Sequence, residues 1–241
     1  MIDFPATDQA LEDPNGLLAV GGDLEPETLV AAYQRGIFPW FDDNQPILWW
    51  TPSPRAVLFP QQLHVSRSLR RTLRRSAWQL GCDDAFPDVV AACAAPRARE
   101  TGTWITDDML AAYTRLHALG IAHSIEVRAG DELIGGLYGV RIGRVFFGES
   151  MFSRRPDASK VALTALCWLG ADGVLDMIDC QMETDHLLRM GACTVSRTEF
   201  EKRLGDAIKE KDVDWHVLKQ LPRSLDRQLG RELPKTVREL L

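Results

Sequence analysis

The chain has 241 residues, of which 45% are hydrophobic, so it can bury enough apolar surface for one large domain and a small one. Five widely spaced cysteines without a CxxC pair argue against a disulfide framework or a zinc knuckle, and the lack of a signal-like start or of a run of about 18 apolar residues argues against secretion and membrane spanning. A net charge of −6 argues, taken alone, against a nucleic-acid partner. We therefore expect a cytoplasmic protein with free thiols.

The first part of the chain predicts a small N-terminal domain. Pro26 in a first turn and Gly36 at the end delimit a short helix. Short loop or strand pieces follow in three apolar stretches, at residues 37–41, 47–50 and 56–60. We expect the N-terminal domain to cover residues 1–62 and a larger second domain to cover residues 63–241.

Charge is segregated along the chain. Residues 1–54 hold nine acids against a single arginine, whereas residues 55–82 hold six arginines and no acid. Ser66 is a suitable N-cap for a helix that has Leu69 and Leu73 on one side. The arginines of this helix are Arg67, Arg70, Arg71, Arg74 and Arg75. With the leucines facing the protein, we expect the arginines to contact phosphates rather than to form an ordinary solvated face.

The rest of the chain predicts an α/β fold with a mixed sheet flanked by helices. Thr106 caps an amphipathic helix that stops at Gly120, and three strands joined by tight glycine-bearing turns follow it. The expected elements after this helix are strands over 122–127, 133–140 and 144–150, a helix over 157–168, a strand over 174–181, a helix over 184–190 and a strand around 193–195. A meander followed by helix, strand, helix and strand is the order of acetyltransferases, which transfer an acyl group to an amine.

The segment after the third strand argues against coenzyme A as the acyl donor. In acetyltransferases this segment is usually a glycine-bearing loop whose amides hold the pyrophosphate of coenzyme A at a helix N-terminus. Residues 150–160 contain no glycine, and Pro156 removes one amide donor. A coenzyme A-dependent N-acetyltransferase remains the alternative enzyme, and a non-catalytic RNA-binding module is the alternative from a different class.

The same segment resembles a known family. The run Gly148-Glu149-Ser150-Met151-Phe152-Ser153 is similar to the signature of leucyl/phenylalanyl-tRNA-protein transferases. Similar blocks lie, in order, at residues 14–19, 21–24, 32–41, 49–50, 54–58, 102–106, 123–127 and 178–181. The resemblance implies an acetyltransferase-like catalytic domain behind a small N-terminal domain. It also implies transfer of Leu or Phe, and by extension Met, from charged tRNA to the α-amino group of proteins that begin with Arg or Lys, which marks those proteins for degradation.

The expected reaction requires few catalytic groups. The ester that links an amino acid to its tRNA is already activated, so we expect no metal, cofactor or covalent nucleophile, and positioning supplies much of the acceleration. Asp179 and Gln181 are two apart on one strand, and Glu149 ends a preceding strand. By resemblance, Gln181, oriented by Asp179, would engage the acceptor amine, and Glu149 would help to hold the reactants.

The resemblance also assigns the substrate cleft and the tRNA-binding surface. Flat side chains suit a cleft that receives an aminoacyl group and the terminal adenosine. The candidate residues of this cleft are Trp40, Trp104, Phe146, Leu137, Met151 and Leu166. The family pattern has an aromatic side chain at the position of Leu166, so the pocket of this chain differs there. The five arginines of the predicted helix would bind the tRNA.

Other conspicuous side chains receive no role in the reaction. The five histidines show no metal-ligand spacing, and Cys180 is expected to be a core thiol on the strand face opposite Asp179 and Gln181. Residues from about 206 onward predict helical pieces broken near Pro222 and Pro234. We expect no membrane partner and a monomer.

Overall fold

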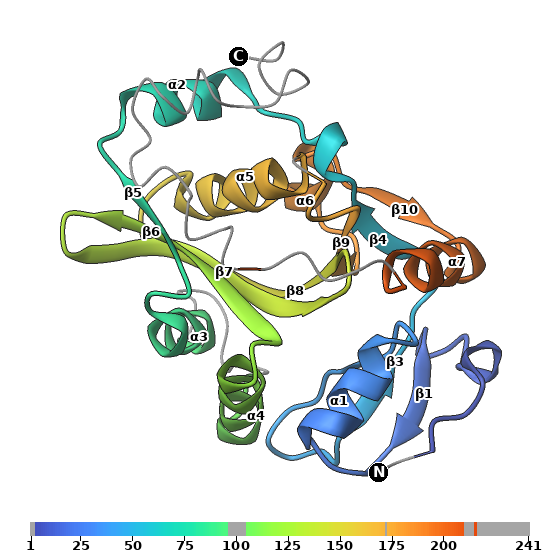
Figure 1. Ribbon diagram of the computed structural model, residues 1–241. Helices are drawn as coiled ribbons and strands as arrows, with labels where there is room; N and C mark the ends of the chain where they lie inside the picture. Colours follow the sequence, from blue (N-terminus) through green and yellow to red (C-terminus); the bar gives the residue numbers. More distant parts are fainter. Residues whose placement is uncertain (1–2, 96–104, 172, 210–214, 216–241) are drawn as a thin grey trace.

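The computed structural model describes residues 3–95, 105–171, 173–209 and 215. A small sheet forms from the first part of the chain (Figure 1). Its elements and neighbours are η1 (Thr7–Gln9), β1 (Leu17–Val20), α1 (Pro26–Tyr33), β2 (Phe38–Pro39) and β3 (Leu48–Trp50). The strand order is β1-β3-β2, and both pairs are antiparallel. The helix predicted from Pro26 is confirmed.

The larger sheet contains the rest of the described strands. They are β4 (Arg55–Leu58), β5 (Gln79–Cys82), β6 (Ala122–Ala129), β7 (Glu132–Ile142), β8 (Val145–Ser153), β9 (Met177–Gln181) and β10 (Cys193–Val195). The strand order is β10-β4-β9-β8-β7-β6-β5, in which β8 and β9 run parallel and the other pairs are antiparallel. The remaining elements are η2 (Pro60–Gln62), α2 (Arg67–Arg75), α3 (Phe86–Ala94), α4 (Asp107–Ala118), α5 (Ala158–Ala171), α6 (Asp185–Arg189) and α7 (Arg197–Ala207).

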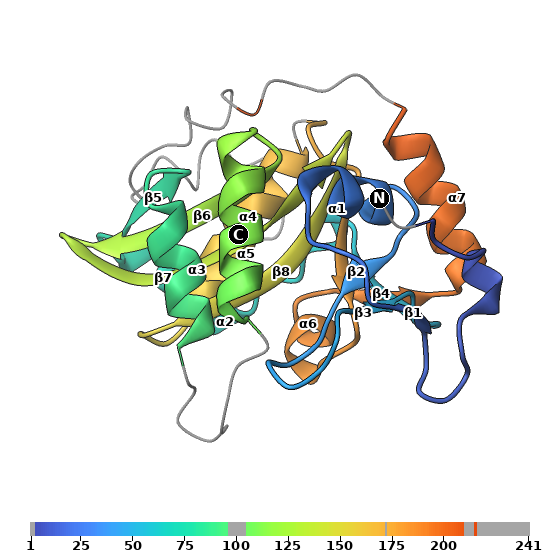
Figure 2. The same ribbon diagram turned by 90° about the horizontal axis from the view of Figure 1, so that it is seen from below.

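Helices cover both faces of the larger sheet. Helix α5 packs on one face with α2 outside it, and α3 and α4 pack on the other face (Figures 1 and 2). One apolar cluster, which includes Leu69, Ile125 and Leu166, fills the α5 side; a second, which includes Tyr33 and Phe147, fills the opposite side. Because both faces are covered, a central strand such as β7 is buried along almost its whole length.

The elements predicted after residue 106 are confirmed in type and order, and the two predicted helix caps are formed. Ser66 Oγ accepts a hydrogen bond from the N–H of Leu69, and Thr106 Oγ1 accepts one from the N–H of Met109. Each cap satisfies one of the amide groups that a helix leaves unpaired at its start. The predicted α/β fold, a mixed sheet flanked by helices after a small N-terminal sheet, is the observed one.

Strand β4 lies in a different place from the one expected. The sequence assigns residues 56–60 to the end of the N-terminal domain, but Arg55–Leu58 forms a strand of the larger sheet, between β9 and β10. All four residues of β4 are buried, so the strand lacks the polar and apolar alternation that would indicate its surroundings. The division into residues 1–62 and 63–241 stays a prediction.

Two further expectations concerned membrane spanning and the C-terminal residues. Among the described residues, no helix combines the length and the apolar character that a membrane span requires. The helical pieces expected beyond α7, near Pro222 and Pro234, lie outside the described residues.

Candidate active site

A cavity opens where the parallel strands β8 and β9 diverge. The two strands pair over residues 145–147 and 177–179 and then separate. The space beyond has a volume of about 1100 Å³ and is lined by residues from both faces of the sheet. Sites in α/β folds commonly lie at the carboxyl ends of parallel strands. The topology therefore places the residues that end β8 and β9 around one cavity.

Two β-bulges shape the edge of this cavity. In β8 the extra residue is Glu149, and in β9 it is Cys180, which lies between Asp179 and Gln181. A bulge bends its strand and turns the neighbouring side chains. Gln181, which follows the bulge in β9, has a φ of +56°, a conformation that residues other than glycine adopt rarely.

Asp179 is fully buried and forms an ion pair with Arg55. Arg55 Nε donates to Asp179 Oδ1 at 2.8 Å, and Nη2 donates to Oδ2 at 2.6 Å. The guanidinium lies 4.8 Å from the ring centroid of Phe38 and 4.6 Å from that of Phe200. Arg55 thus belongs to the site and not to the basic surface, a role that the six-arginine run concealed.

Gln181 is attached to Asp179 through its backbone. Its N–H donates to Asp179 Oδ1 at 3.0 Å, so Asp179 fixes the position of the main chain rather than of the carboxamide. The Gln181 Nε2 atom is buried and has no hydrogen-bond partner among the described residues, and neither does the hydroxyl of Tyr138. Both residues line the cavity. Buried polar groups without partners indicate where the polar atoms of a substrate can bind.

Glu149 is held by two tyrosines from different helices. The hydroxyls of Tyr33 in α1 and Tyr113 in α4 donate to Glu149 Oε1 and Oε2, each at 2.7 Å, and the two hydroxyl oxygens are 2.5 Å apart. With Glu149 ionised, two hydroxyl protons serve three short contacts. With Glu149 protonated, three protons serve the three contacts, and one of the two tyrosines accepts from the carboxyl O–H instead of donating to it. The geometry therefore favours the neutral acid.

The pKa of Glu149 agrees with this proton count. Burial raises the pKa to about 7, against the hydrogen bonds from Tyr33 and Tyr113, which lower it; Asp179 raises it further and Arg55 lowers it. An acid whose pKa is raised on folding binds its proton more tightly in the folded state. The free energy of unfolding therefore falls as pH rises from the unfolded pKa, about 4.5, to about 7.

Replacing Glu149 with Gln should remove this pH dependence. The neutral amide cannot ionise, so the variant should gain stability relative to the parent as pH rises through this range, by at most about 3 kcal/mol. Urea unfolding of both proteins at pH 5 and pH 8 measures the difference. An identical pH dependence in the two proteins would show that Glu149 titrates normally. We expect slower transfer by the variant as well.

The described apolar candidates line the cavity, and all of them except Trp40 lie on the side that faces α5. The cavity-lining residues among those predicted from the sequence are Trp40, Leu137, Phe146, Met151 and Leu166. Trp40 is 41% exposed and lies at the rim, whereas Phe146 is fully buried. Trp104 lies outside the described residues. Cys180 was expected to be a core thiol, but it is only half-buried and lines the same cavity, although it packs against the apolar cluster on the α5 side and burial raises the pKa of its thiol.

Trp215 is a neighbour of this pocket that no sequence pattern indicated. It is buried and packs against the α5-side cluster, with its ring nearly parallel to Phe146 at a centroid distance of 5.9 Å. His123 stacks on it at 4.2 Å. Trp215 therefore supports Phe146, one of the walls of the cavity. No motif in the sequence near Trp215 predicts this contact with Phe146.

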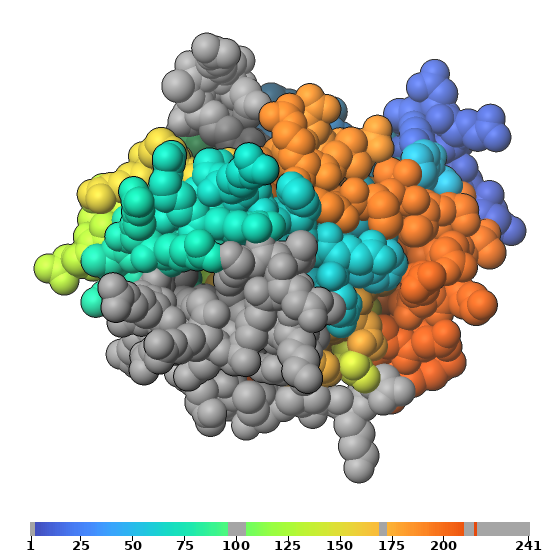
Figure 3. All heavy atoms as spheres, turned by 90° about the horizontal axis from the view of Figure 1, so that it is seen from above, coloured from blue at the N-terminus to red at the C-terminus, as the bar shows by residue number. Residues whose placement is uncertain are grey.

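Helix α2 presents a basic surface apart from the cavity. Leu69 and Leu73 are buried against the protein, and the five arginines of the helix surround a shallow hollow of about 400 Å³. Figure 3 shows α2 along the outer face of the molecule. Arg67 and Arg71 are exposed, whereas Arg70 is half-buried and donates from Nε to the carbonyl oxygen of Val65.

Comparison with known proteins decides which enzyme has this arrangement. The family model for leucyl/phenylalanyl-tRNA protein transferase matches residues 57–205, and the model for the N-terminal domain of the same transferase matches residues 22–53. The chain belongs to the leucyl/phenylalanyl-tRNA-protein transferase family. It is thus an aminoacyltransferase whose substrates are aminoacyl-tRNA and protein, as the motifs predicted, and neither an RNA-binding module nor a coenzyme A-dependent acetyltransferase.

Named relatives cover most of this transferase. A leucyl/phenylalanyl-tRNA–protein transferase of Nitrosomonas eutropha is 56% identical over 215 residues, which are 88% of this chain and 92% of the relative. One of Pseudomonas entomophila is 58% identical over 201 residues, 83% of this chain and 89% of the relative. Among solved structures, a GCN5-related N-acetyltransferase from Kribbella flavida aligns with a TM-score of 0.37 and 10% identity, over 71% of this chain and 61% of that one.

Proposed function

We propose that the cavity between β8 and β9 is the active site in which Leu or Phe from charged tRNA is joined to the α-amino group of proteins that begin with Arg or Lys. The added residue marks those proteins for degradation. The proposal rests on the observation that apolar and polar side chains line the same cavity. Apolar side chains fill the α5 side, and Glu149, Asp179 and Gln181 gather where the strands end. An apolar pocket for the donor side chain therefore adjoins the polar groups that an amine and an ester require.

The polar residues have separable tasks in this proposal. The carboxamide oxygen of Gln181 can accept a hydrogen bond from the incoming amine, and its unpartnered Nε2 can donate to a carbonyl oxygen. The Arg55–Asp179 pair holds the backbone of Gln181 in its strained conformation. Glu149, neutral or close to its pKa at pH 7, lies beside the same cavity and helps to hold the reactants.

The proposal also covers the binding of the tRNA donor, the oligomeric state and the cellular location. The arginines of α2 bind phosphates of the tRNA, and the apolar walls, with Trp104 as a further candidate, receive the aminoacyl group and terminal adenosine. A monomeric enzyme is also part of the proposal. A cytoplasmic location is part of the proposal, because charged tRNA is made there and the described cysteines are free thiols.

Incubation with charged tRNA and a peptide that begins with Arg tests the proposal. Mass spectrometry should detect one added Leu, Phe or Met, because an apolar pocket separates such side chains by only about 1 to 3 kcal/mol per methylene. Asp-tRNA and Lys-tRNA should give no product, since a charged side chain would be buried unpaired. A peptide that begins with Ala is the matched acceptor control. Efficient transfer of Asp or Lys would contradict an apolar donor pocket.

A further inference from the structure

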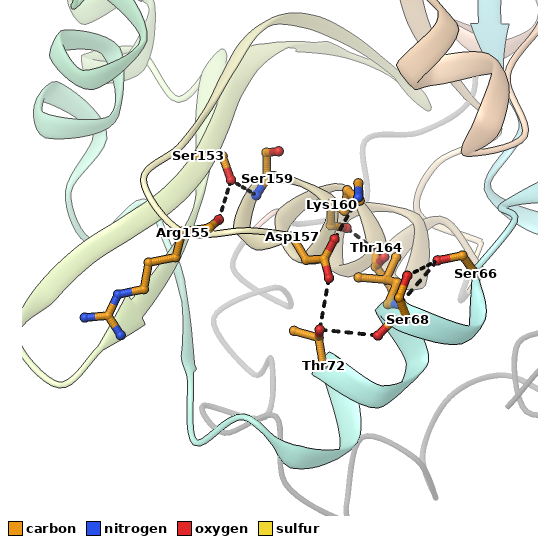
Figure 4. A network of polar contacts seen from close by, with 10 residues as sticks. Ser66, Ser68, Thr72, Ser153, Arg155, Asp157, Ser159, Lys160 and Thr164 are labelled. Atoms are coloured by element: carbon orange, nitrogen blue, oxygen red, sulfur yellow. Dashed lines mark hydrogen bonds and ion pairs between the residues drawn. The ribbon is translucent and has the colours of Figure 1, made fainter. Parts of the chain in front are cut away.

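A hydrogen bond between side chains joins helix α2 to the edge of the cavity. Thr72 lies in the middle of α2, between the buried Leu69 and Leu73. Its hydroxyl donates to Asp157 Oδ2 at 3.0 Å, and the carbonyl oxygen of Ser68 lies farther away, at 3.3 Å (Figure 4). Because Asp157 is an anion, the shorter contact is also the stronger one. Asp157 thus ties the arginine-bearing helix to a different part of the fold.

Asp157 is itself fixed from two sides. It precedes α5 with a φ of +69°, a conformation that Asp tolerates better than most residues. Lys160 Nζ donates to its Oδ1 at 2.7 Å, so the two carboxylate oxygens bind two different partners. Burial raises the pKa of this carboxyl, but the hydrogen bonds from Lys160 and Thr72, together with the positive charges of Lys160 and Arg71, lower it, and the net pKa lies below its ordinary value. The carboxylate is therefore charged at neutral pH.

The residues just before Asp157 lead directly to the cavity. Ser153 Oγ donates to the carbonyl oxygen of Arg155 at 2.8 Å and accepts from the N–H of Ser159 at 3.2 Å, which closes the turn between β8 and α5 (Figure 4). Ser153 and Ser159 both line the cavity. The same turn thus contains Ser153, which lines the cavity, and Asp157, which accepts the hydrogen bond from α2.

We propose that Asp157 is a positioning residue that holds the arginine helix at a fixed place relative to the cavity rim. The inference rests on the proposed tRNA contact of α2. Phosphates bound by α2 then determine where the aminoacyl end of the tRNA lies, and the Thr72–Asp157 contact keeps that end aligned with the cavity. Without the contact, α2 retains its arginines and its packing, but tRNA binding must also fix the position of the helix, which weakens the apparent affinity for tRNA.

Thr72→Val tests the inference, because it removes the hydroxyl while it preserves shape, charge and helix propensity. With Leu-tRNA as donor, KM should rise about three- to tenfold, the size of the net contribution of one ordinary hydrogen bond, with little change in kcat. With leucyl-adenosine, which has no acceptor-arm phosphates, kcat/KM should not change. Thr72→Ser keeps the hydroxyl and should behave like the parent. Thr114→Val, which removes a similar hydroxyl of α4 that donates to Leu110, is the control.

Asp157→Gly supplies an independent arm, since glycine adopts the same positive φ without strain. The double variant with Thr72→Val should be no worse than the more affected single variant if both act through the one contact. Equal losses with Leu-tRNA and leucyl-adenosine, or an unchanged KM for Leu-tRNA, would overturn the inference. If the removal of arginines from α2 also leaves tRNA binding unchanged, the proposed tRNA surface itself is wrong, and the two failures are thereby distinguished.

Discussion

Asp179→Ala should lower the free energy of unfolding by about 3 to 5 kcal/mol and abolish transfer. The substitution leaves the buried guanidinium of Arg55 without its counter-ion, and an unpaired buried charge is among the most destabilising features in a protein. It also removes the acceptor of the Gln181 N–H, which releases a strained backbone beside the cavity. Chemical denaturation measures the first effect, and transfer from Leu-tRNA to an Arg-starting peptide measures the second.

A double variant separates folding from function at this pair. Arg55→Met with Asp179→Leu replaces both charges with apolar groups, and such replacements are often neutral or stabilising. We expect the double variant to recover most of the lost stability while transfer remains undetectable. A single Asp179→Ala variant that unfolds at the same denaturant concentration as the parent would show that the ion pair adds no stability. Transfer at the parental rate by the double variant would remove the pair from the active site.

Removing three arginines from one stripe of α2 should weaken binding of every charged tRNA. Arg67, Arg71 and Arg75 are exposed and four residues apart, so they lie along one side of the helix. Loss of three phosphate contacts should reduce the slope of log affinity against log salt by about 2 to 3 units. Phosphate contacts carry no information about the amino acid, so the preference among Leu, Phe and Met should stay the same.

A control variant with the same change in net charge separates direct phosphate contacts from an effect of total charge. Alanine at Arg115, Lys202 and Arg203 removes the same charge from α4 and α7, away from α2. That variant should keep both the affinity and the salt slope of the parent, since steering by total charge is weak compared with direct contact. An α2 variant with unchanged affinity and slope would mean that the helix is a solvated face and that the tRNA binds elsewhere.

Local patterns in the sequence were sufficient for most of the helices and for the meander. Helix caps, Gly-bearing turns and amphipathic spacing act over a few residues, so they could be read directly at Ser66 and Thr106. Strand β4 could not be placed in this way. Its neighbours β9 and β10 lie more than a hundred residues away in the chain, and a fully buried strand has no face that distinguishes one sheet from another.

The main residues of the candidate site were predictable from the sequence, but the contacts that hold them in place were not. The family motifs marked Glu149, Asp179 and Gln181, and the structure brings all three to one cavity. Arg55 looked like part of a basic surface because charge counting does not register burial. The two tyrosines that hold Glu149 come from separate helices, and a contact between residues so far apart follows from tertiary packing alone. The bulges at Glu149 and Cys180 likewise arise from strand pairing and leave no local pattern.

The single-turnover rate of Gln181→Ala tests most directly whether this cavity carries out the transfer. Gln181 is half-buried at the end of β9, and alanine there disturbs neither the Arg55–Asp179 pair nor the tyrosines around Glu149. The variant, saturated with Leu-tRNA and an Arg-starting peptide, should keep its melting temperature and its tRNA affinity while the rate of peptide leucylation falls by about a hundredfold or more, as expected for removal of a group that stabilises the transition state. A folded, tRNA-binding variant that transfers leucine at the parental rate would contradict the assignment of this cavity as the active site.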